Sequence, residues 1–138
     1  MKPSCLIKVP SSLDGGTFFH WWIRFLNPFH DLTSREMDVT AAFFQYRYEL
    51  SKTVHDSVLL DKLAIDSDAR HVVKTRLKLS INYINVILSK LRKCGIVIQD
   101  RLNPRFIPDV KHDGNKASFS VLIVFDFKQD ENKEKETK

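Results

Sequence analysis

Apolar side chains recur every three or four residues through much of the chain before residue 95, the period of helices with one buried face. The clearest case follows Thr33-Ser34-Arg35-Glu36, a capping-box pattern in which the Thr33 hydroxyl and the Glu36 carboxylate each accept a bond from a backbone amide. The sequence predicts a helix from there to about Ser51, with a buried stripe of Met37, Ala41, Phe44 and Tyr48.

Shorter helices are predicted on either side of this one. A helix over Thr17–Asn27 is expected to end before Pro28, because proline cannot continue the hydrogen-bond ladder. Another helix is predicted over Val54–Ile65, with its buried side formed by Leu59, Leu60 and Leu63. Asp66-Ser67 is expected to cap a helix over Asp68–Leu77, whose buried residues would be Ala69, Val72, Val73 and Leu77.

After residue 79 the pattern changes from helical to strand-like. Ser80 is placed to cap a helix that ends at Gly95, a residue suited to the left-handed backbone of a helix end. Ile96–Ile98 then begins a strand, and Ser118–Phe127, rich in Val, Ile and Phe, is predicted to be a second. Two prolines and an Asp-Gly turn interrupt the connection between these two strands.

The excess positive charge is concentrated in one part of the chain. The net charge is +5 over 138 residues, yet residues 70–111 hold ten basic residues and two acids, a local charge of +8. Such a concentration is typical of a surface that neutralises phosphates, and equally of a solvated basic face. Charge alone leaves both interpretations open.

No catalytic or metal-binding motif accompanies this charge. The five histidines are scattered, without HExxH or Cys/His ligand spacing, and neither GxSxG nor a phosphate-binding glycine loop occurs. The acidic pairs, interpreted as helix-start and surface residues, are Asp56 with Asp61 and Asp66 with Asp68. We therefore expect no enzyme activity, no metal and no cofactor.

The remaining composition favours a cytoplasmic protein. The longest apolar run, Val121–Phe125, is too short to cross a bilayer, and the first 16 residues lack the apolar region of a secretory signal. Cys5 and Cys94 form no CxxC pair and are expected to be reduced thiols. The hydrophobic fraction of 43% is enough for one domain with a buried core.

The order helix, three-residue turn, helix and two strands resembles a winged helix-turn-helix. The residues that match this family's pattern are Leu79-Ser80, Ile84, Leu88, Leu91, Gly95 and Ile96-Val97, within a resemblance that covers about Ser67–Phe127. The resemblance implies a mostly α fold with a small β-hairpin wing, preceded by additional N-terminal helices. One domain is expected over residues 17–127. The prolines and the Asp-Gly-Gly turn signal predict an irregular segment at 1–16, and the charged tail at 128–138, which has no hydrophobic residue, is expected to be disordered.

The resemblance also implies that the second helix of the motif enters the major groove of duplex DNA. Asn can pair with adenine, Ser with several bases, and Tyr with phosphate, while Val86 could meet a thymine methyl group. Position 86 often carries a basic residue in the family, so Val86 weakens the expectation. The candidate contacts of the helix are Ser80, Asn82, Tyr83, Asn85, Val86, Ser89, Lys90 and Lys93, with Lys74 and Lys78 on the preceding elements.

The connection between the two predicted strands would form the wing. Basic residues at its base and tip could reach a phosphate or the minor groove, namely Arg101, Arg105, Lys111 and Lys116. The same residues are equally typical of a solvated loop. We expect DNA contact from the helix and keep the wing contacts as candidates.

Two main functions remain open from the sequence, with a replication-initiator accessory as a weaker third. The first is a DNA-binding transcriptional regulator, in many such proteins a homodimer, and the second is a structural or adaptor protein that binds other proteins. The aromatic segment TFFHWWIRFLN is expected mainly to pack in the core, with a partner surface as the alternative. The strings KVPSSLDGG, LTSREMDVTAAFFQYRYELS and LNPRFIPD resemble small uncharacterised proteins of crAss-like bacteriophages, which implies the host bacterial cytoplasm or the virion.

Overall fold

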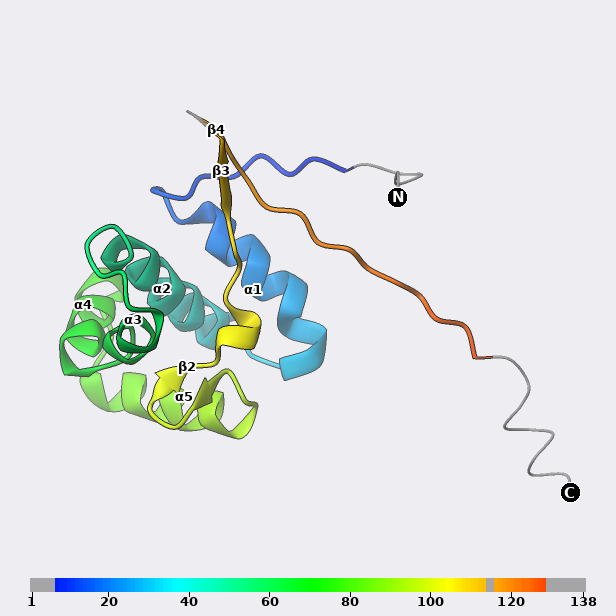
Figure 1. Ribbon diagram of the computed structural model, residues 1–138. Coiled ribbons are helices and arrows are strands. Elements are labelled where there is room, and N and C mark those ends of the chain that lie inside the picture. Colours follow the sequence, from blue (N-terminus) through cyan, green and yellow to red (C-terminus); the bar gives the residue numbers. More distant parts are fainter. Residues whose placement is uncertain (1–6, 114–115, 129–138) are drawn as a thin grey trace, which may run out of the picture. The chain divides into compact units, whose positions relative to one another are not determined.

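The computed structural model describes residues 7–113 and 116–128, with the side chains of 111–116 excepted. The chain divides after Ile107 into two compact units. Among the described residues the first unit contains five α-helices and a short β-hairpin, and the second contains another two-stranded hairpin followed by an extended segment (Figure 1). The mostly helical class with a small antiparallel hairpin, expected from the sequence, is confirmed.

The elements follow one another with short connections. The helices are α1 Thr17–His30, α2 Ser34–Leu50, α3 Ser57–Leu63, α4 Ser67–Leu77 and α5 Ile81–Lys93. The remaining elements of the first unit are β1 Val97–Ile98, β2 Arg101–Leu102 and the 3-10 turn η1 Pro104–Phe106. The second unit has β3 Lys111–Asp113 and β4 Lys116–Ser118.

Helix α2 is the central element of the first unit, because it contacts each of the other four helices (Figure 1). Its capping box is confirmed: Thr33 N donates to Glu36 Oε1 at 2.8 Å, and Glu36 N donates to Thr33 Oγ1 at 3.3 Å. The predicted buried stripe covers less of the helix surface than is actually buried at this central position. Val39, Thr40, Ala42 and Phe43 are buried as well, as expected of a helix surrounded by others.

The hydrophobic core lies between α2 and the elements that pack on it. Its largest fully buried side chains come from every helix except α3 and from the first hairpin, and include Ile23, Phe43, Phe44, Val73, Ile84, Leu91 and Leu102. The buried residues of α4 and α5 were predicted in part. Those confirmed are Ala69, Val73, Ile84, Leu88 and Leu91. Val72 and Leu77 are only partly buried.

Helix α1 begins at Thr17 as predicted but differs from its predicted form at the C-terminal end. It continues through Pro28 to His30, so the prediction that it ends at Asn27 is wrong. Proline removes one amide donor but its fixed φ is helical, and only the last turn follows it. The chain then leaves the helix at Asp31, in the left-handed region, where Asn27 Oδ1 accepts from the amide of Leu32 at 2.7 Å. The helix starts after Gly16 with no side-chain cap.

Helix α3 is shorter than predicted and exposes different residues. It begins after Asp56, whose carboxylate accepts from the amides of Val58 and Leu59, and it ends at Leu63. Leu60 is buried as expected, but Leu59 is 47% exposed, so its predicted inward position is wrong. The inward position is taken instead by Asp61, which is 2% exposed and pairs with arginines of α2 and β2.

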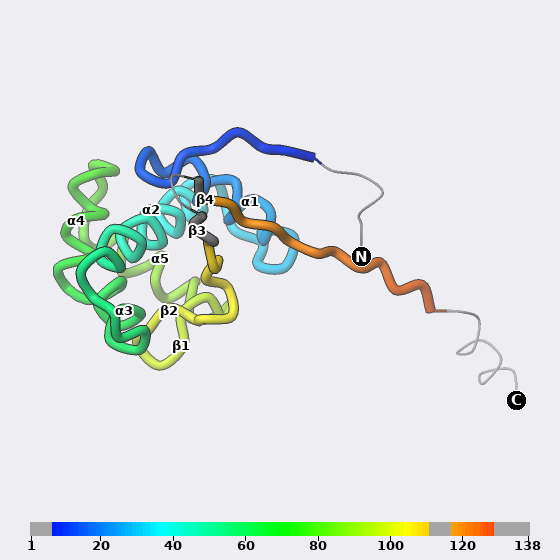
Figure 2. Tube along the Cα trace, turned by 45° about the horizontal axis from the view of Figure 1, so that its top comes forward, coloured from blue at the N-terminus to red at the C-terminus, as the bar shows by residue number. Residues whose placement is uncertain are grey.

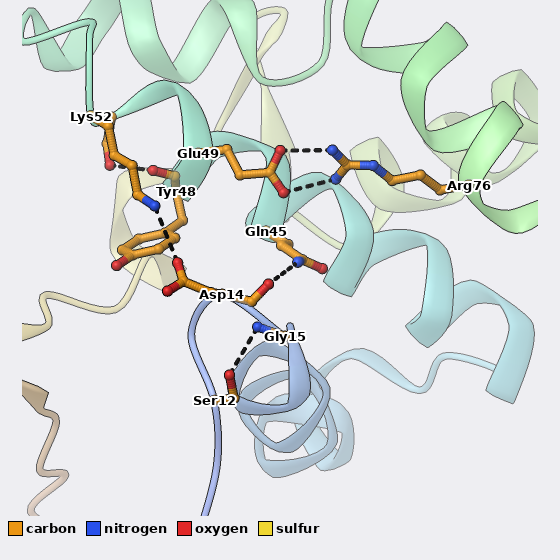
Figure 3. A network of polar contacts seen from close by, with 9 residues as sticks. Ser12, Asp14, Gly15, Gln45, Tyr48, Glu49, Lys52 and Arg76 are labelled. Carbon is orange, nitrogen blue, oxygen red and sulfur yellow. Dashed lines mark hydrogen bonds and ion pairs between the residues drawn. The ribbon is translucent and has the colours of Figure 1, made fainter.

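Figure 3 shows how the end of α2 is held by polar contacts on two sides. Glu49 accepts two hydrogen bonds from the Arg76 guanidinium of α4, at 2.7 and 2.9 Å, the two-pronged geometry that arginine favours with carboxylates. On the other side Lys52 Nζ lies 3.1 Å from Asp14 Oδ1 in the segment before α1, and this bond raises the pKa of Lys52.

The first hairpin closes within six residues. Val97 pairs with Leu102 and Ile98 with Arg101, so the strand at Ile96–Ile98 is present but its predicted partner, Ser118–Phe127, is wrong. The two turn residues, Gln99 and Asp100, both have positive φ, at 49° and 59°. This is the pattern of a type I′ turn, which matches the natural twist of antiparallel strands.

The second unit contains the other hairpin, in which Lys111 pairs with Ser118 and Asp113 with Lys116. The strand ends at Ser118, so most of the strand predicted over Ser118–Phe127 is not formed. Residues 119–128 are extended and without regular secondary structure (Figure 2). The predicted charged tail begins at residue 128, and its residues 129–138 lie outside the described part of the chain.

Candidate nucleic-acid interface

Helices α4 and α5 are joined by a three-residue turn, as in a helix-turn-helix. Lys78 ends α4 in the left-handed conformation, at φ 55°, and its amide donates to Lys74 O. Leu79 N also bonds Lys74 O, at 3.1 Å, which closes the turn. Ser80 then caps α5, because its Oγ accepts from the amide of Tyr83 at 3.1 Å. The predicted turn and N-cap are therefore confirmed.

Helix α5 has one buried and one exposed face. Ile84, Leu88 and Leu91 are buried as predicted, and Ile87 joins them. The opposite face is exposed and consists of Asn82, Tyr83, Asn85, Val86, Ser89 and Lys93. Tyr83 is 40% and Val86 65% exposed, so two large apolar groups lie among the polar ones. The face can therefore offer amide and hydroxyl hydrogen bonds together with apolar contacts to a ligand.

Cations lie on both sides of α5, at the end of α4 and in the turn before α5 and again in the last turns of α5. Lys74 and Lys90 are partly exposed, and Lys78, Arg92 and Lys93 are exposed. Among the described residues, none of these five forms an ion pair. Arg92 lies beside Lys93 in the last turn of α5. Their charges are available to an anion.

Other cations of the basic segment are already engaged within the protein. Arg76 binds Glu49. Arg101, a predicted wing contact, has its Nη2 3.5 Å from Oδ2 of Asp61, and its side chain is only 23% exposed. Arg47 Nε binds Oδ1 of the same carboxylate at 2.8 Å. The interpretation of Asp61 as a surface residue is wrong, because its side chain is buried. Two arginines from distant parts of the sequence compensate its charge there.

The other predicted wing residues belong to η1 of the first unit and to the hairpin of the second unit. Arg105 is exposed in η1, with its guanidinium 5.9 Å from the ring centroid of Phe106. Lys111 and Lys116 belong to the strands of the second unit, and their side chains lie outside the described part of the structure. The hairpin that directly follows α5 is instead β1–β2, whose turn residues are Gln99 and Asp100.

A second exposed surface lies on α1. Phe19, Ile23 and Leu26 face the core, whereas Trp21, Phe25 and Phe29 are 51%, 41% and 77% exposed. The expectation that the aromatic segment TFFHWWIRFLN is mainly buried is wrong for Trp21 and Phe25, and Phe29 lies just beyond that segment. Aromatic side chains surround this helix, and only one side of it can face α2.

Neither a metal centre nor a membrane span accompanies these surfaces in the part of the chain that the structure describes. No three His, Cys, Asp or Glu side chains are grouped there as ligands of one ion. Every helix there is too short or too polar to cross a bilayer.

Comparison with known proteins assigns no family. No protein-family model matches the chain, and no similar protein was found among the curated proteins or the solved structures. The functional inference therefore depends on the α4–α5 motif, its exposed side chains and the distribution of charge.

Proposed function

We propose that this protein binds double-stranded DNA, with α5 in the major groove and the cations of α4 and α5 on the phosphates. The observation that supports this most is the exposed face of α5, formed by Asn82, Tyr83, Asn85, Val86 and Ser89 behind a helix-turn-helix turn. Asparagine amides match the N6/N7 edge of adenine, and valine matches the methyl group of thymine.

The charges near this face fit the same role. Lys78 precedes the N-terminus of α5, and Lys90, Arg92 and Lys93 lie in its last turns. Cations at both ends of a neutral recognition surface are suited to bind the phosphates on either side of a groove, where they position the helix without reading sequence. Cations in the last turn also stabilise the helix dipole, so they have a structural role as well.

The biological role that this activity supports is transcriptional regulation. The resemblance to winged helix-turn-helix proteins implies it, and the resemblance to crAss-like bacteriophage proteins extends it to a phage-encoded regulator that acts in the host bacterial cytoplasm. Dimers of such proteins bind sites with two-fold symmetry, so a dimeric form of this chain would favour a pseudo-palindromic site.

The test is the salt dependence of binding to random duplex DNA, measured by fluorescence anisotropy at about 50 and 200 mM salt. Each phosphate neutralised adds about 0.9 to the slope of log affinity against log salt. We expect affinity to fall by orders of magnitude and Lys90→Ala to reduce the slope by about 0.9. Lys62→Ala, an exposed lysine of α3, is the matched control and should leave the slope unchanged. Absence of binding at the lower salt would contradict the proposal.

A second candidate function is that of a structural or adaptor protein, such as a virion component. It is favoured by the exposed aromatic residues Trp21, Phe25 and Phe29, which recur every four residues and so share one face of α1. Exposed aromatic clusters of this kind are typical of protein interfaces.

This alternative is tested by recovering bound proteins with the native chain and with a Trp21→Ala, Phe29→Ala chain. Proteins lost only from the variant, with DNA binding unchanged, would favour the adaptor. Equal recovery with both chains would contradict it.

A further inference from the structure

Residues 119–127, here named the apolar segment, expose more hydrophobic surface than any comparable stretch of the described chain. Its large apolar side chains from Val121 to Phe127 are between 46% and 80% exposed. Among the described residues, the backbone of Val121–Phe127 forms no hydrogen bond with another segment. Contiguous apolar surface is unfavourable in water and marks a site of association, and a backbone without strand partners can pair with another strand.

The segment continues β4 without a break in sequence character. No Pro or Gly lies between Ser118 and Phe127, and Val, Ile and Phe have high strand propensity. The first strand of the hairpin cannot serve as partner for the whole apolar segment. Extending the register that pairs Lys111 with Ser118 would place Pro108 opposite Val121, and proline has no amide to donate. Beyond that point a strand needs a partner from outside its own hairpin.

Alternation along the segment gives it two different faces. In an extended strand, successive side chains point to opposite sides. One side is apolar throughout and consists of Phe119, Val121, Ile123, Phe125 and Phe127. The other side is polar at both ends and apolar in the middle, and consists of Ser120, Leu122, Val124 and Asp126. A partner strand must preserve this division to join the segment favourably.

We propose that the apolar segments of two copies of this chain pair as antiparallel β-strands about a two-fold axis at Ile123. In this register Val121 lies opposite Phe125 and the two Ile123 residues lie opposite each other, so the apolar sides coincide. On the other side Ser120 lies opposite Asp126, where its hydroxyl can donate to the carboxylate. The same patch is self-complementary on both copies, as a two-fold interface requires.

Other pairings of two copies fit less well. A shift by one residue would mix the two sides, because it places odd-numbered residues opposite even-numbered ones. A parallel in-register pair would set Asp126 beside Asp126, and like charges at that distance repel. The antiparallel register centred on Ile123 neither mixes the two sides nor places the Asp126 residues together, and it pairs every residue of the apolar segment. This inference does not depend on DNA binding.

The first test is the mass of the full chain in solution, measured by sedimentation equilibrium over a range of concentrations. We expect a dimer, and we expect Ile123→Lys to be a monomer because it places two ammonium groups together at the axis. Leu59→Lys, which adds the same charge at an exposed leucine of α3, should remain a dimer. Far-UV circular dichroism controls for folding, since the segment supplies none of the buried core residues.

The second test is specific for the register and uses a chain with Cys5→Ser and Cys94→Ser. Under mild oxidation Ile123→Cys should form a disulfide-linked dimer, because directly opposed residues bring Cα atoms within about 5.5 Å. Phe127→Cys should not, because its counterpart would lie eight residues along the partner strand, about 27 Å away. A monomeric native chain, a dimer that persists in Ile123→Lys, or equal cross-linking at both positions would overturn the proposal.

Discussion

The carboxylate of Asp61 on α3 lies 3.5 Å from the guanidinium of Arg101 on β2, and this pair joins the helical part of the first unit to its hairpin. Arg47 of α2 binds the other oxygen of the same carboxylate at 2.8 Å. Asp61 is 2% exposed, so both arginines approach a carboxylate that is withdrawn from solvent. Arg101 thereby becomes part of the fold's interior instead of the cationic surface around α5.

Replacing Asp61 by Ala should destabilise the protein strongly. Breaking a buried ion pair by removing one partner typically costs about 3–5 kcal/mol, because the other charge is left without compensation. Here two arginines would lose their carboxylate, although both are partly exposed, which reduces the cost. Urea denaturation followed by circular dichroism measures the change. Asp68→Ala, an exposed residue of α4, should cost less than about 1 kcal/mol, and an equally small loss at Asp61 would contradict the assignment.

His30 should make stability depend on pH near neutrality. Burial lowers the pKa of His30 below its ordinary value of 6.5, opposed in part by the backbone of Cys94. Because the folded state favours the neutral ring, the unfolded state binds more protons below pH 6.5, and the free energy of unfolding must fall as the pH decreases through that value.

The measurement is the urea midpoint between about pH 7.5 and 5.5, a range above the titration of ordinary carboxylates. The native chain should lose stability toward the acidic end, while His30→Leu should show a smaller slope because it removes the titrating group. Equal slopes in both chains would show that His30 is not the group responsible.

The type I′ turn predicts opposite effects from two substitutions at Asp100. Its φ of 59° lies in the region that glycine adopts without strain and that β-branched residues avoid. Asp100→Gly should raise the free energy of unfolding by roughly 0.5–1 kcal/mol, and Asp100→Val should lower it by at least about 1 kcal/mol. Thermal denaturation of the two variants checks this, and the same sign for both would contradict the turn assignment.

The exposed asparagines of α5 should determine the sequence preference of DNA binding. In the Asn82→Ala, Asn85→Ala chain, sites selected by the native protein should lose roughly 1–3 kcal/mol of preference per base contact removed, while binding to random DNA changes little. Competition between selected and random duplexes measures this ratio. An unchanged ratio would mean that these amides do not contact bases.

Local signals predicted the helices of this protein well where the residues that determine a helix lie within that helix or next to it. The capping box at Thr33, the Ser80 cap and the spacing of Ile84, Leu88 and Leu91 all depend on residues within a few positions of one another, and each is present in the structure. The exposed face of α5 follows from the same spacing, because the residues between the buried ones must face outward.

Sequence spacing failed where a residue's surroundings come from distant elements. Leu59 and Asp61 lie two positions apart on α3, and their exposures are the reverse of what their polarity suggests. Asp61 can be buried because Arg47 of α2 and Arg101 of β2 each place a charged donor beside its carboxylate. Burial of a paired charge depends on partners that local pattern does not identify.

The sequence by itself thus determined the order and caps of the central helices and the polarity of α5, because helix formation and capping act over three or four residues. Tertiary structure alone decided which aromatic residues of α1 remain exposed and which cations stay available to a ligand. These outcomes depend on which side of an element meets a neighbour, and the neighbours come from far along the chain. Residues 118–127 have a strand-forming sequence, but the hairpin does not supply a partner strand for most of them.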